Sequence, residues 1–300
     1  MENRVKGIGL ILLGSLVVSP IGAVVAGFDH INAFELVMLR CAGITAFFVL
    51  VIVLTGGPQE RKTTKLTEIG RPGLIASVAL GTAFALAVYA FQNAPVARVL
   101  LLFATAPLQA AVIARLFLNE HLSGVTSVAV ALSLVGVVLI VFGGQEDEST
   151  IHQSNWGSLA AFIASTFYAI FSVALRAGKN IDMRVSMALS GIVGLVLALV
   201  IFLLSAEQIR SSPQEALAML GVGFFLTGGA FLLYTVGSKS VSAAEFTMIS
   251  LFEIFLGSLW AWMFLDQGIS RMTLFGGALF LIALILNARF GHDVRTQRTP

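Results

Sequence analysis

Residues 34–55 read FELVMLRCAGITAFFVLVIVLT, and this stretch indicates whether the chain folds in water or in a lipid bilayer. The hydrocarbon core of a bilayer is about 30 Å thick, so a helix that crosses it needs roughly 20 mainly apolar residues. The stretch meets that requirement. It predicts a membrane-spanning helix that carries one arginine, Arg40, inside the apolar layer.

The rest of the chain repeats this pattern, with polar interruptions between apolar runs. The ten predicted spans cover residues 5–27, 34–55, 72–91, 95–118, 123–142, 156–176, 184–205, 214–237, 242–265 and 270–290. The first run is too long for a signal-peptide core, and many similar runs follow it, so we interpret it as a span. The predicted fold class is an all-α integral membrane protein.

Composition supports a lipid environment and excludes several other classes of protein. Hydrophobic residues make up 57% of the chain and charged residues 11%, against roughly 25% charged in ordinary globular domains. The net charge of +2 is too small to indicate a nucleic-acid partner. A single cysteine, Cys41, and four histidines without ligand spacing predict no disulfide, metal site or cofactor. Motifs for ATP hydrolysis are also missing from the sequence, which argues against a primary pump.

Lys and Arg in short loops stay on the cytoplasmic side of a membrane, so their positions predict the orientation. With the N-terminus in the cytoplasm, the outer loops collect only Arg98, Arg210 and Arg271. The cytoplasmic side collects Arg4, Lys6, Arg61, Lys62, Lys65, Arg71, Arg115, Arg176, Lys179, Arg184, Lys239, Arg289, Arg295 and Arg298. Both termini are therefore predicted to be cytoplasmic, and the predicted location is a bacterial inner (plasma) membrane.

Each half has an odd number of spans, so the second half starts on the opposite side of the membrane from the first. Any repeat between the halves is therefore an inverted one, as in many secondary transporters. The predicted units are a first five-helix repeat over 1–143, an acidic extracytoplasmic linker over 144–155, and a second repeat with a cytoplasmic tail over 156–300. A short match supports the repeat, because LFLNE (116–120) ends the fourth span and MFLDQ (263–267) ends the ninth.

Several motifs resemble the ten-span EamA-type members of the drug/metabolite transporter superfamily. The stretch with Tyr89, NAPVA (93–97), Pro107 and LFLNE (116–120) resembles the family's pattern over spans 3 and 4. Leu39-Arg40-Cys41 resembles its span 2 arginine, and LFEIFLG (251–257) resembles its span 9 pattern. The chain departs from that pattern at Ile254, where many members have Pro, and at Asp266-Gln267, where they have Gly-Glu.

The resemblance implies a central cavity lined mainly by spans 1–4 and 6–9, with spans 5 and 10 at the periphery. The family includes exporters of amino acids and other metabolites. The resemblance does not identify the substrate.

Two charged side chains, Arg40 and Glu253, lie deep in predicted spans, where a charge usually faces the bundle interior and has a partner. At 1.5 Å per residue, Glu253 lies about 16 Å into its span and Arg40 about 9 Å. One interpretation is structural, either a salt bridge or separate hydrogen bonds. The other is functional: Glu253 contacts a substrate amine or exchanges a proton during transport.

Other candidate residues lie in the spans that the resemblance assigns to the cavity. An amide and aromatic rings suit a site for a mixed polar and apolar solute. The alternative is that these side chains pack helices or sit in the interfacial belt. The candidate substrate-binding residues are Gln109, Tyr89, Tyr234, Tyr168 and Trp260.

Pro20 and Pro107 each remove a helix donor and are predicted to loosen or kink their spans. Such kinks serve either as gating hinges or as fixed packing features. Glu120 lies near the cytoplasmic end of the fourth span, where a charge cluster or part of an inner gate is expected.

The predicted function is transport and not catalysis. A secondary transporter or facilitator is expected to export a small metabolite, such as an amino acid, by alternating access, with protons as the candidate coupling ion. The alternatives are another cargo (a vitamin, nucleoside or drug-like cation), an intramembrane enzyme, or a receptor. The protein is expected to work as a monomer or a homodimer, with the lipid bilayer and a small-molecule substrate as its partners.

Overall fold

The structure is a computed structural model, and it describes residues 2–21, 24, 28, 30–55, 69–93, 96–120, 123–143, 155–205, 208–265 and 271–290. Within these ranges every regular element is a helix. The predicted acidic linker and the C-terminal tail lie almost entirely outside them.

The first half of the chain contains six of these helices. They are α1 (Glu2–Val18), α3 (Ala33–Thr55), α5 (Gly70–Asn93), α6 (Val96–Phe103), α7 (Ala106–Leu118) and α8 (Gly124–Gly143). The second half contains α9 (Asn155–Ala177), α10 (Arg184–Leu204), α11 (Pro213–Gly221), the π-helix η2 (Val222–Gly228), α12 (Gly229–Gly237), the 3-10 turn η3 (Ser238–Ser240), α13 (Ala243–Ser250), α14 (Phe252–Leu265) and α15 (Arg271–Phe290).

Each predicted span contains helix, although α1 ends at Val18 and the first predicted span extends to residue 27, and three spans are not uniform α-helices. The fourth is divided into α6 and α7, the ninth into α13 and α14, and the eighth passes through η2. Five described stretches are individually long and apolar enough to cross a membrane: Ala33–Thr55, Gly70–Ala90, Trp156–Ala177, Arg184–Leu204 and Pro213–Ser240. Breaks and π-helical turns need packing partners to satisfy their backbone groups, and hydropathy does not report those partners.

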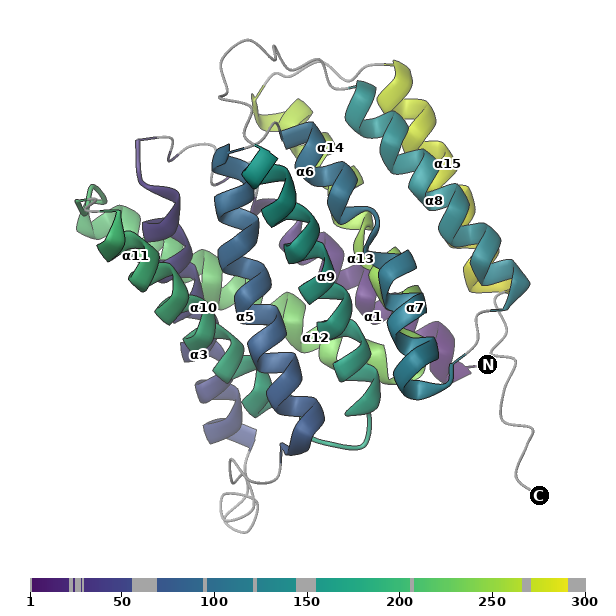
Figure 1. The fold of residues 1–300 in the computed structure, drawn as a ribbon, viewed down its shortest axis with the longest axis horizontal. Helices are drawn as coiled ribbons and strands as arrows, with labels where there is room; N and C mark the ends of the chain where they lie inside the picture. The colour runs from purple at the N-terminus through teal and green to yellow at the C-terminus, as the bar shows by residue number, and fades with distance from the viewer. Residues whose placement is uncertain are drawn as a thin grey trace.

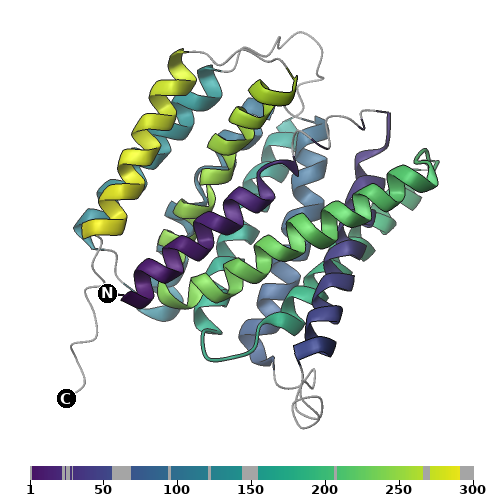
Figure 2. The same ribbon diagram turned by 180° about the vertical axis from the view of Figure 1, so that it is seen from behind.

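The helices pack side by side in one bundle (Figures 1 and 2). The most extensive contacts are between α5 and α9, α8 and α15, and α3 and α10. Helices α8 and α15 contact each other far more than they contact the rest, and both views show them together at one edge. The remaining helices surround the centre of the bundle.

Helices at the same position in the two halves are counterparts: α1 and α9, α3 and α10, α5 and the segment of η2 and α12, α7 and α14, and α8 and α15. When each helix is exchanged for its counterpart, most packing pairs become other packing pairs of the bundle. The pair α5–α9 then becomes α12–α1, and α5–α10 becomes η2–α3. The pairs α3–α10 and α8–α15 each join two counterparts, and α7–α9 becomes α14–α1. The two halves therefore contact each other in an approximately reciprocal way.

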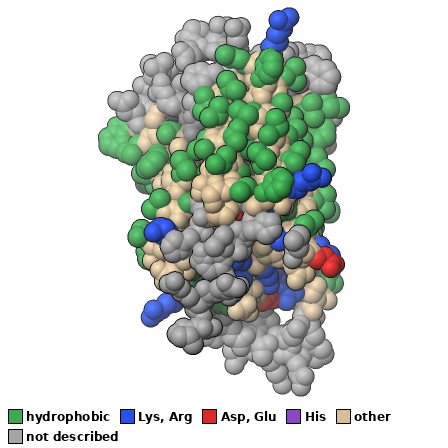
Figure 3. Space-filling view, turned by 90° about the vertical axis from the view of Figure 1, so that its right-hand side faces the viewer, with side chains coloured by type: hydrophobic (Ala, Val, Ile, Leu, Met, Phe, Trp, Pro, Cys, Tyr) green, Lys and Arg blue, Asp and Glu red, His purple; other side chains and the backbone are tan. Residues whose placement is uncertain are grey.

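One end of the bundle carries most of the described charges. We call it the basic end: it is where α1, α5, α8, α10 and α13 begin (Figure 1). Described basic residues near it are Arg4, Lys6, Arg71, Arg115, Arg176, Lys179, Arg184, Lys239 and Arg289. From the side of α8 and α15, hydrophobic side chains cover the upper surface and Lys and Arg gather mostly below (Figure 3).

Local sequence determines several helix ends. Ser212 and Glu215 form a reciprocal capping box at the start of α11, and Ser242 and Glu245 do the same for α13. At the end of α7, Asn119 adopts a left-handed conformation with φ of 52°, a residue type that tolerates this region. These caps start α13 and end α7 at the basic end.

Candidate functional site

Two helix breaks mark the centre of the bundle. Helix α6 ends at Phe103 and α7 begins at Ala106, whereas α13 and α14 are separated by Leu251. Ala104 and Leu251 are separated along the chain by the same distance as the matching motifs that begin at Leu116 and Met263. The two broken helices are therefore counterparts in the two halves, and α7 packs against α13.

Arg40 approaches this centre from α3 with incomplete hydrogen bonding. Its guanidinium carbon lies 4.9 Å from the centroid of the Phe84 ring, a cation–π contact. Its Nε is buried and has no hydrogen-bond partner in the described part of the chain. The side chain as a whole remains partly accessible. Arg40 therefore has unused hydrogen-bonding capacity among the described residues.

Helix α3 can lie close to the π-helical turn because Gly223 has no side chain. A Cβ on Gly223 would lie 2.1 Å from the carbonyl oxygen of Arg40, which is shorter than any allowed contact. A Cβ on Gly43 would lie 2.3 Å from the carbonyl oxygen of Leu220, on the facing segment. The close helix contact thus positions the backbone of Arg40.

Glu253 lies in the first turn of α14, immediately after the break. Its carboxylate lies near the hydroxyl of Tyr234, and this hydroxyl is 3.0 Å from Oγ of Ser15. Tyr168 is within electrostatic range of Glu253 and donates a 3.1 Å hydrogen bond to Ser250. Polar groups of α1, α9 and α12 therefore lie in the neighbourhood of this carboxylate.

Arg40 and Glu253 interact electrostatically but do not form an ion pair. Each charge is felt by the other, yet no nitrogen–oxygen contact within 4.0 Å joins these two described residues. Both side chains are partly accessible. The two halves thus place a guanidinium and a carboxylate within electrostatic range of each other but without an ion-pair contact.

Gln109 forms a second polar group at the other helix break. Its Nε2 donates to Thr105 at 2.8 Å and to Ser165 at 3.2 Å. Its Oε1 is buried and has no partner among the described residues. Ser165 and Tyr168 lie one turn apart on α9, so this helix connects the polar group at α7 with the group around Glu253.

Aromatic rings surround the charged centre. Phe84 packs edge-on against Phe231 at 5.6 Å, and Phe231 packs against Tyr234 at 5.4 Å. Tyr234 in turn contacts Phe246 at 5.4 Å. Apolar rings exclude water and strengthen electrostatic interactions between the charges they enclose.

The remaining predicted residues lie apart from this group or have structural contacts. Tyr89 packs with Ala90 and Val99, and the indole nitrogen of Trp260 donates to Ser19 at 2.7 Å.

Pro20 follows the end of α1. Pro107 lies in the first turn of α7, where a missing N–H leaves no helix bond unmade, so it follows a break and does not kink a continuous helix.

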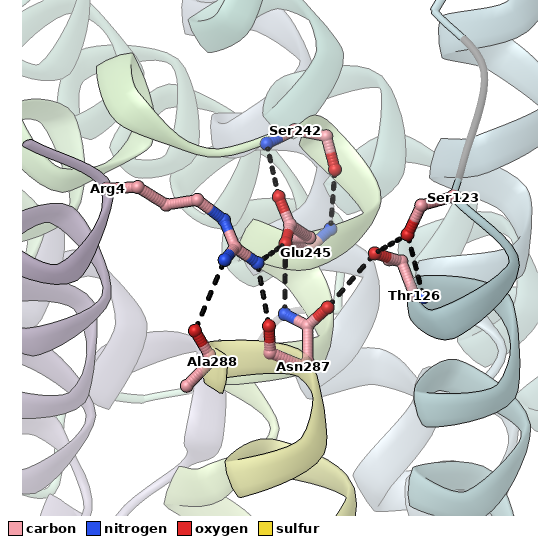
Figure 4. A network of polar contacts seen from close by, with 7 residues as sticks. All are labelled: Arg4, Ser123, Thr126, Ser242, Glu245, Asn287 and Ala288. Carbon is pink, nitrogen blue, oxygen red and sulfur yellow. Dashed lines mark hydrogen bonds and ion pairs between the residues drawn. The ribbon is translucent and has the colours of Figure 1, made fainter. Parts of the chain in front are cut away.

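A network at the basic end was not predicted from the sequence (Figure 4). Arg4 of α1 forms an ion pair with Glu245 of α13, and it donates to the backbone oxygens of Asn287 and Ala288. Asn287 donates to Glu245 at 3.0 Å and accepts from Thr126 of α8 at 3.0 Å. Four helices from both halves are therefore joined by mostly buried polar groups.

A second connection between the halves at the basic end involves Glu120, a predicted gate residue. Nε of Arg176 donates to Oε1 of Glu120 at 2.7 Å, and the Arg176 guanidinium also reaches the carbonyl of Lys239. The capping boxes and the charges near helix ends were the only sequence signals for these two networks, and they do not specify the partners.

At the opposite end, Glu35 was also not predicted as a site residue. It is buried in α3 and accepts hydrogen bonds from the backbone N–H groups of Arg210 and Ser211. These contacts attach the segment before α11 to α3. Among the described residues, no group of His, Cys, Asp and Glu side chains is placed to hold a metal ion.

The fold and the polar centre define the class: a multi-pass membrane transporter with broken helices around charged groups. The chain belongs to the EamA-like transporter family, whose sequence model matches residues 5–142 and 155–289. One family model matches each half separately, so the halves are related in sequence to one unit.

Known relatives agree with this assignment. An uncharacterized transporter of Clostridium kluyveri is 22% identical over 254 residues, covering 79% of each chain. Solute carrier family 35 member G1 of Homo sapiens is 26% identical over 292 residues, covering 92% of this chain and 77% of that protein. A solved structure, titled only as the crystal structure of a protein, has the same fold with a TM-score of 0.77 at 17% identity, covering 96% of this chain and 99% of that one.

Proposed function

We propose that the protein is a secondary transporter or facilitator that exports a small metabolite, an amino acid or a related compound. The observation that carries this proposal is that Arg40 of α3 lies within electrostatic range of Glu253, which follows the helix break between α13 and α14. Transporters bind substrates and coupling ions at such breaks, because freed backbone groups and helix ends face a cavity there.

Alternating access is the mechanism that this arrangement supports. The reciprocal packing of the two halves is the pattern expected of an inverted repeat, in which one half rocks against the other around a fixed site. We propose that all ten helical stretches cross the membrane. Residues from both halves then form the site, so that their relative motion exposes it to one side at a time.

We propose that the basic end faces the cytoplasm of a bacterial cell, in its inner membrane. The described Lys and Arg residues gather there, and basic loops are retained on the cytoplasmic side. The Arg4–Glu245–Asn287 network and the Glu120–Arg176 pair then act as an inner gate, because each connects the first half to the second. Opening toward the cytoplasm separates both.

Counterflow in proteoliposomes tests the proposed function directly. Vesicles are loaded with one unlabelled amino acid at a time, and uptake of the same labelled compound is followed with and without an imposed pH gradient. Exchange above protein-free vesicles for at least one amino acid supports the proposal, and acceleration by the gradient supports proton coupling. Exchange only of a vitamin, nucleoside or organic cation contradicts the assigned cargo.

A further inference from the structure

A groove lies between α3, α10 and α11, toward the end of the bundle opposite the basic end. Its volume is about 450 Å³, within the size range of ligand sites. The three helices lie at the edge of the bundle away from α8 and α15 (Figures 1 and 2). Neither Arg40 nor Glu253 is among the described residues that line the groove, so it is distinct from the charged centre.

The lining of the groove is mostly apolar. On α3 it extends from Glu35 to Ala42, about 10 Å at 1.5 Å per residue, and on α10 it includes Leu195 and Leu199. Leu199 is 39% exposed, so the groove opens on the outer surface of the bundle. Further exposed apolar side chains of α10 continue this surface: Val196, Val200, Leu203 and Leu204. The groove therefore opens on a face that suits lipid.

Polar groups lie at one end of the groove, where two carboxylates already have partners. Glu35 accepts a hydrogen bond from the backbone N–H of Arg210 at 3.0 Å. Glu215 accepts from the backbone N–H of Ser212 at 2.8 Å and lies 3.0 Å from Nε2 of His30. The carboxylates thus attach the segment before α11 to neighbouring groups. They offer little to a ligand deeper in the groove.

Within a bilayer the groove must be filled by apolar groups. A void would forfeit dispersion contacts, and water would find few hydrogen-bond partners beyond Glu35. Lipid chains are as apolar as the lining, so burying a chain adds little affinity over the surrounding bilayer. A contact with the headgroup is therefore needed to hold one lipid there in preference to others.

We propose that the groove holds one glycerophospholipid of the outer leaflet, with an acyl chain along α3 and α10 and its phosphate at Arg210. Arg210 is exposed and lies between Ile209 and Ser211, which both line the groove. It precedes α11 at the end of the bundle, which is the level of the headgroups in the proposed orientation. A guanidinium binds phosphate through paired, charge-assisted hydrogen bonds. This lipid site is separate from the transport site of the proposed function.

The test is photolabelling of the purified protein in vesicles of phosphatidylethanolamine and phosphatidylglycerol. A phosphatidylethanolamine with a diazirine midway along one acyl chain is compared with a diacylglycerol that has the same chains and no phosphate. Peptides from α3 and α10 are expected to carry at least about fivefold more phospholipid label than peptides from α8 and α15, as for one charged hydrogen bond. The diacylglycerol should label the four helices evenly. Even labelling by the phospholipid contradicts the proposal.

Two variants test the headgroup and the chain separately. Arg210→Gln should lower the phospholipid label on α3 and α10 about fivefold, and Arg71→Gln, at an exposed position of the basic end, is the matched control. Ala216→Leu fills part of the groove and should also lower this label. Ala218→Leu, at an exposed position of the same helix, is its control. Unchanged labelling in either Arg210→Gln or Ala216→Leu contradicts the proposal.

A second copy of the chain is the rival occupant of the groove. It would shield α3 and α10 from both probes, and native mass spectrometry would show a dimer without bound lipid, which overturns the proposal. Retention of one phospholipid for each chain, lost in Arg210→Gln, supports it. The comparison of the two probes uses the unaltered protein and measures no flux, so its failure leaves the proposed function intact.

Discussion

Nε of Arg176, at the end of α9, lies 2.7 Å from Oε1 of Glu120, which follows α7. The two residues belong to different halves, and the same guanidinium also reaches the carbonyl of Lys239. The pair is only partly exposed, with 12% and 25% of the two side chains accessible, so water screens it less than a surface pair. It links the two halves at the basic end.

Breaking this pair should favour opening at the basic end. In a Cys41→Ser background, Ser250→Cys reports access to the centre by its reaction with a membrane-impermeant thiol reagent applied from the cytoplasmic side. Glu120→Gln and Arg176→Gln are each expected to raise the reaction rate about 5- to 30-fold, as for about 1–2 kcal/mol of lost interaction. The Glu120→Arg/Arg176→Glu exchange should lower it again. Unchanged rates in both single variants contradict the gate.

Asn287 should stabilise the fold through the network that it forms with Arg4, Glu245 and Thr126. Asn287→Ala leaves the Thr126 hydroxyl without this acceptor and removes a donor from Glu245, so it should cost about 1–3 kcal/mol of unfolding free energy. Thr126→Val removes the hydroxyl itself and should cost less. Unfolding of both variants and of the double variant in detergent micelles measures their coupling. Strict additivity would mean that the two side chains do not interact.

Charge on Glu253 should be needed for transport and not for folding. Glu253→Gln keeps the size of the side chain and an acceptor for Tyr234, so the folded yield in detergent should be unchanged. Counterflow should fall at least about tenfold through loss of one charged interaction. Glu2→Gln, on an exposed surface pair, is the control. A collapse of folded yield would instead support a structural role for Glu253.

Gly223 should be required for the close contact between α3 and the π-helical turn. Gly223→Ala places a methyl group against the carbonyl of Arg40 and should destabilise the fold by about 1–3 kcal/mol, with lower transport. Gly221→Ala is the matched control, since a Cβ at that position meets nothing within 4 Å. Thermal unfolding of the two variants compares them. Equal stability of both would show that the helices adjust without strain.

The orientation is testable by labelling in intact cells. In the Cys41→Ser background, an impermeant maleimide should react with the Gln214→Cys protein at once. It should react with the Lys179→Cys protein only after the membrane is permeabilised, because Lys179 lies at the basic end. Permeabilised cells, in which both sites should react, control for intrinsic reactivity. The reverse order would place the basic end outside the cell.

The positions of the helical stretches were predictable from local sequence. Apolar runs such as 34–55 and 184–205 coincide with α3 and α10, because each residue's preference for lipid adds along a helix regardless of its neighbours in the fold. Arg40 and Glu253 were recognisable for the same reason, as charges inside such runs. Pro107 also indicated a weakness in the fourth span, although it follows the break and does not form it.

Pairing between distant residues depended on the tertiary structure. Nothing local at Leu251 announces a helix break, since the next helix begins without a proline, and nothing in VGFFLTG (222–228) specifies a π-helix. Arg4, Glu245 and Asn287 are each ordinary in their own segments, and they become a network only where four helices converge. Burial and hydrogen bonding depend on which surfaces meet, so the separation between Arg40 and Glu253 exists only in the assembled bundle.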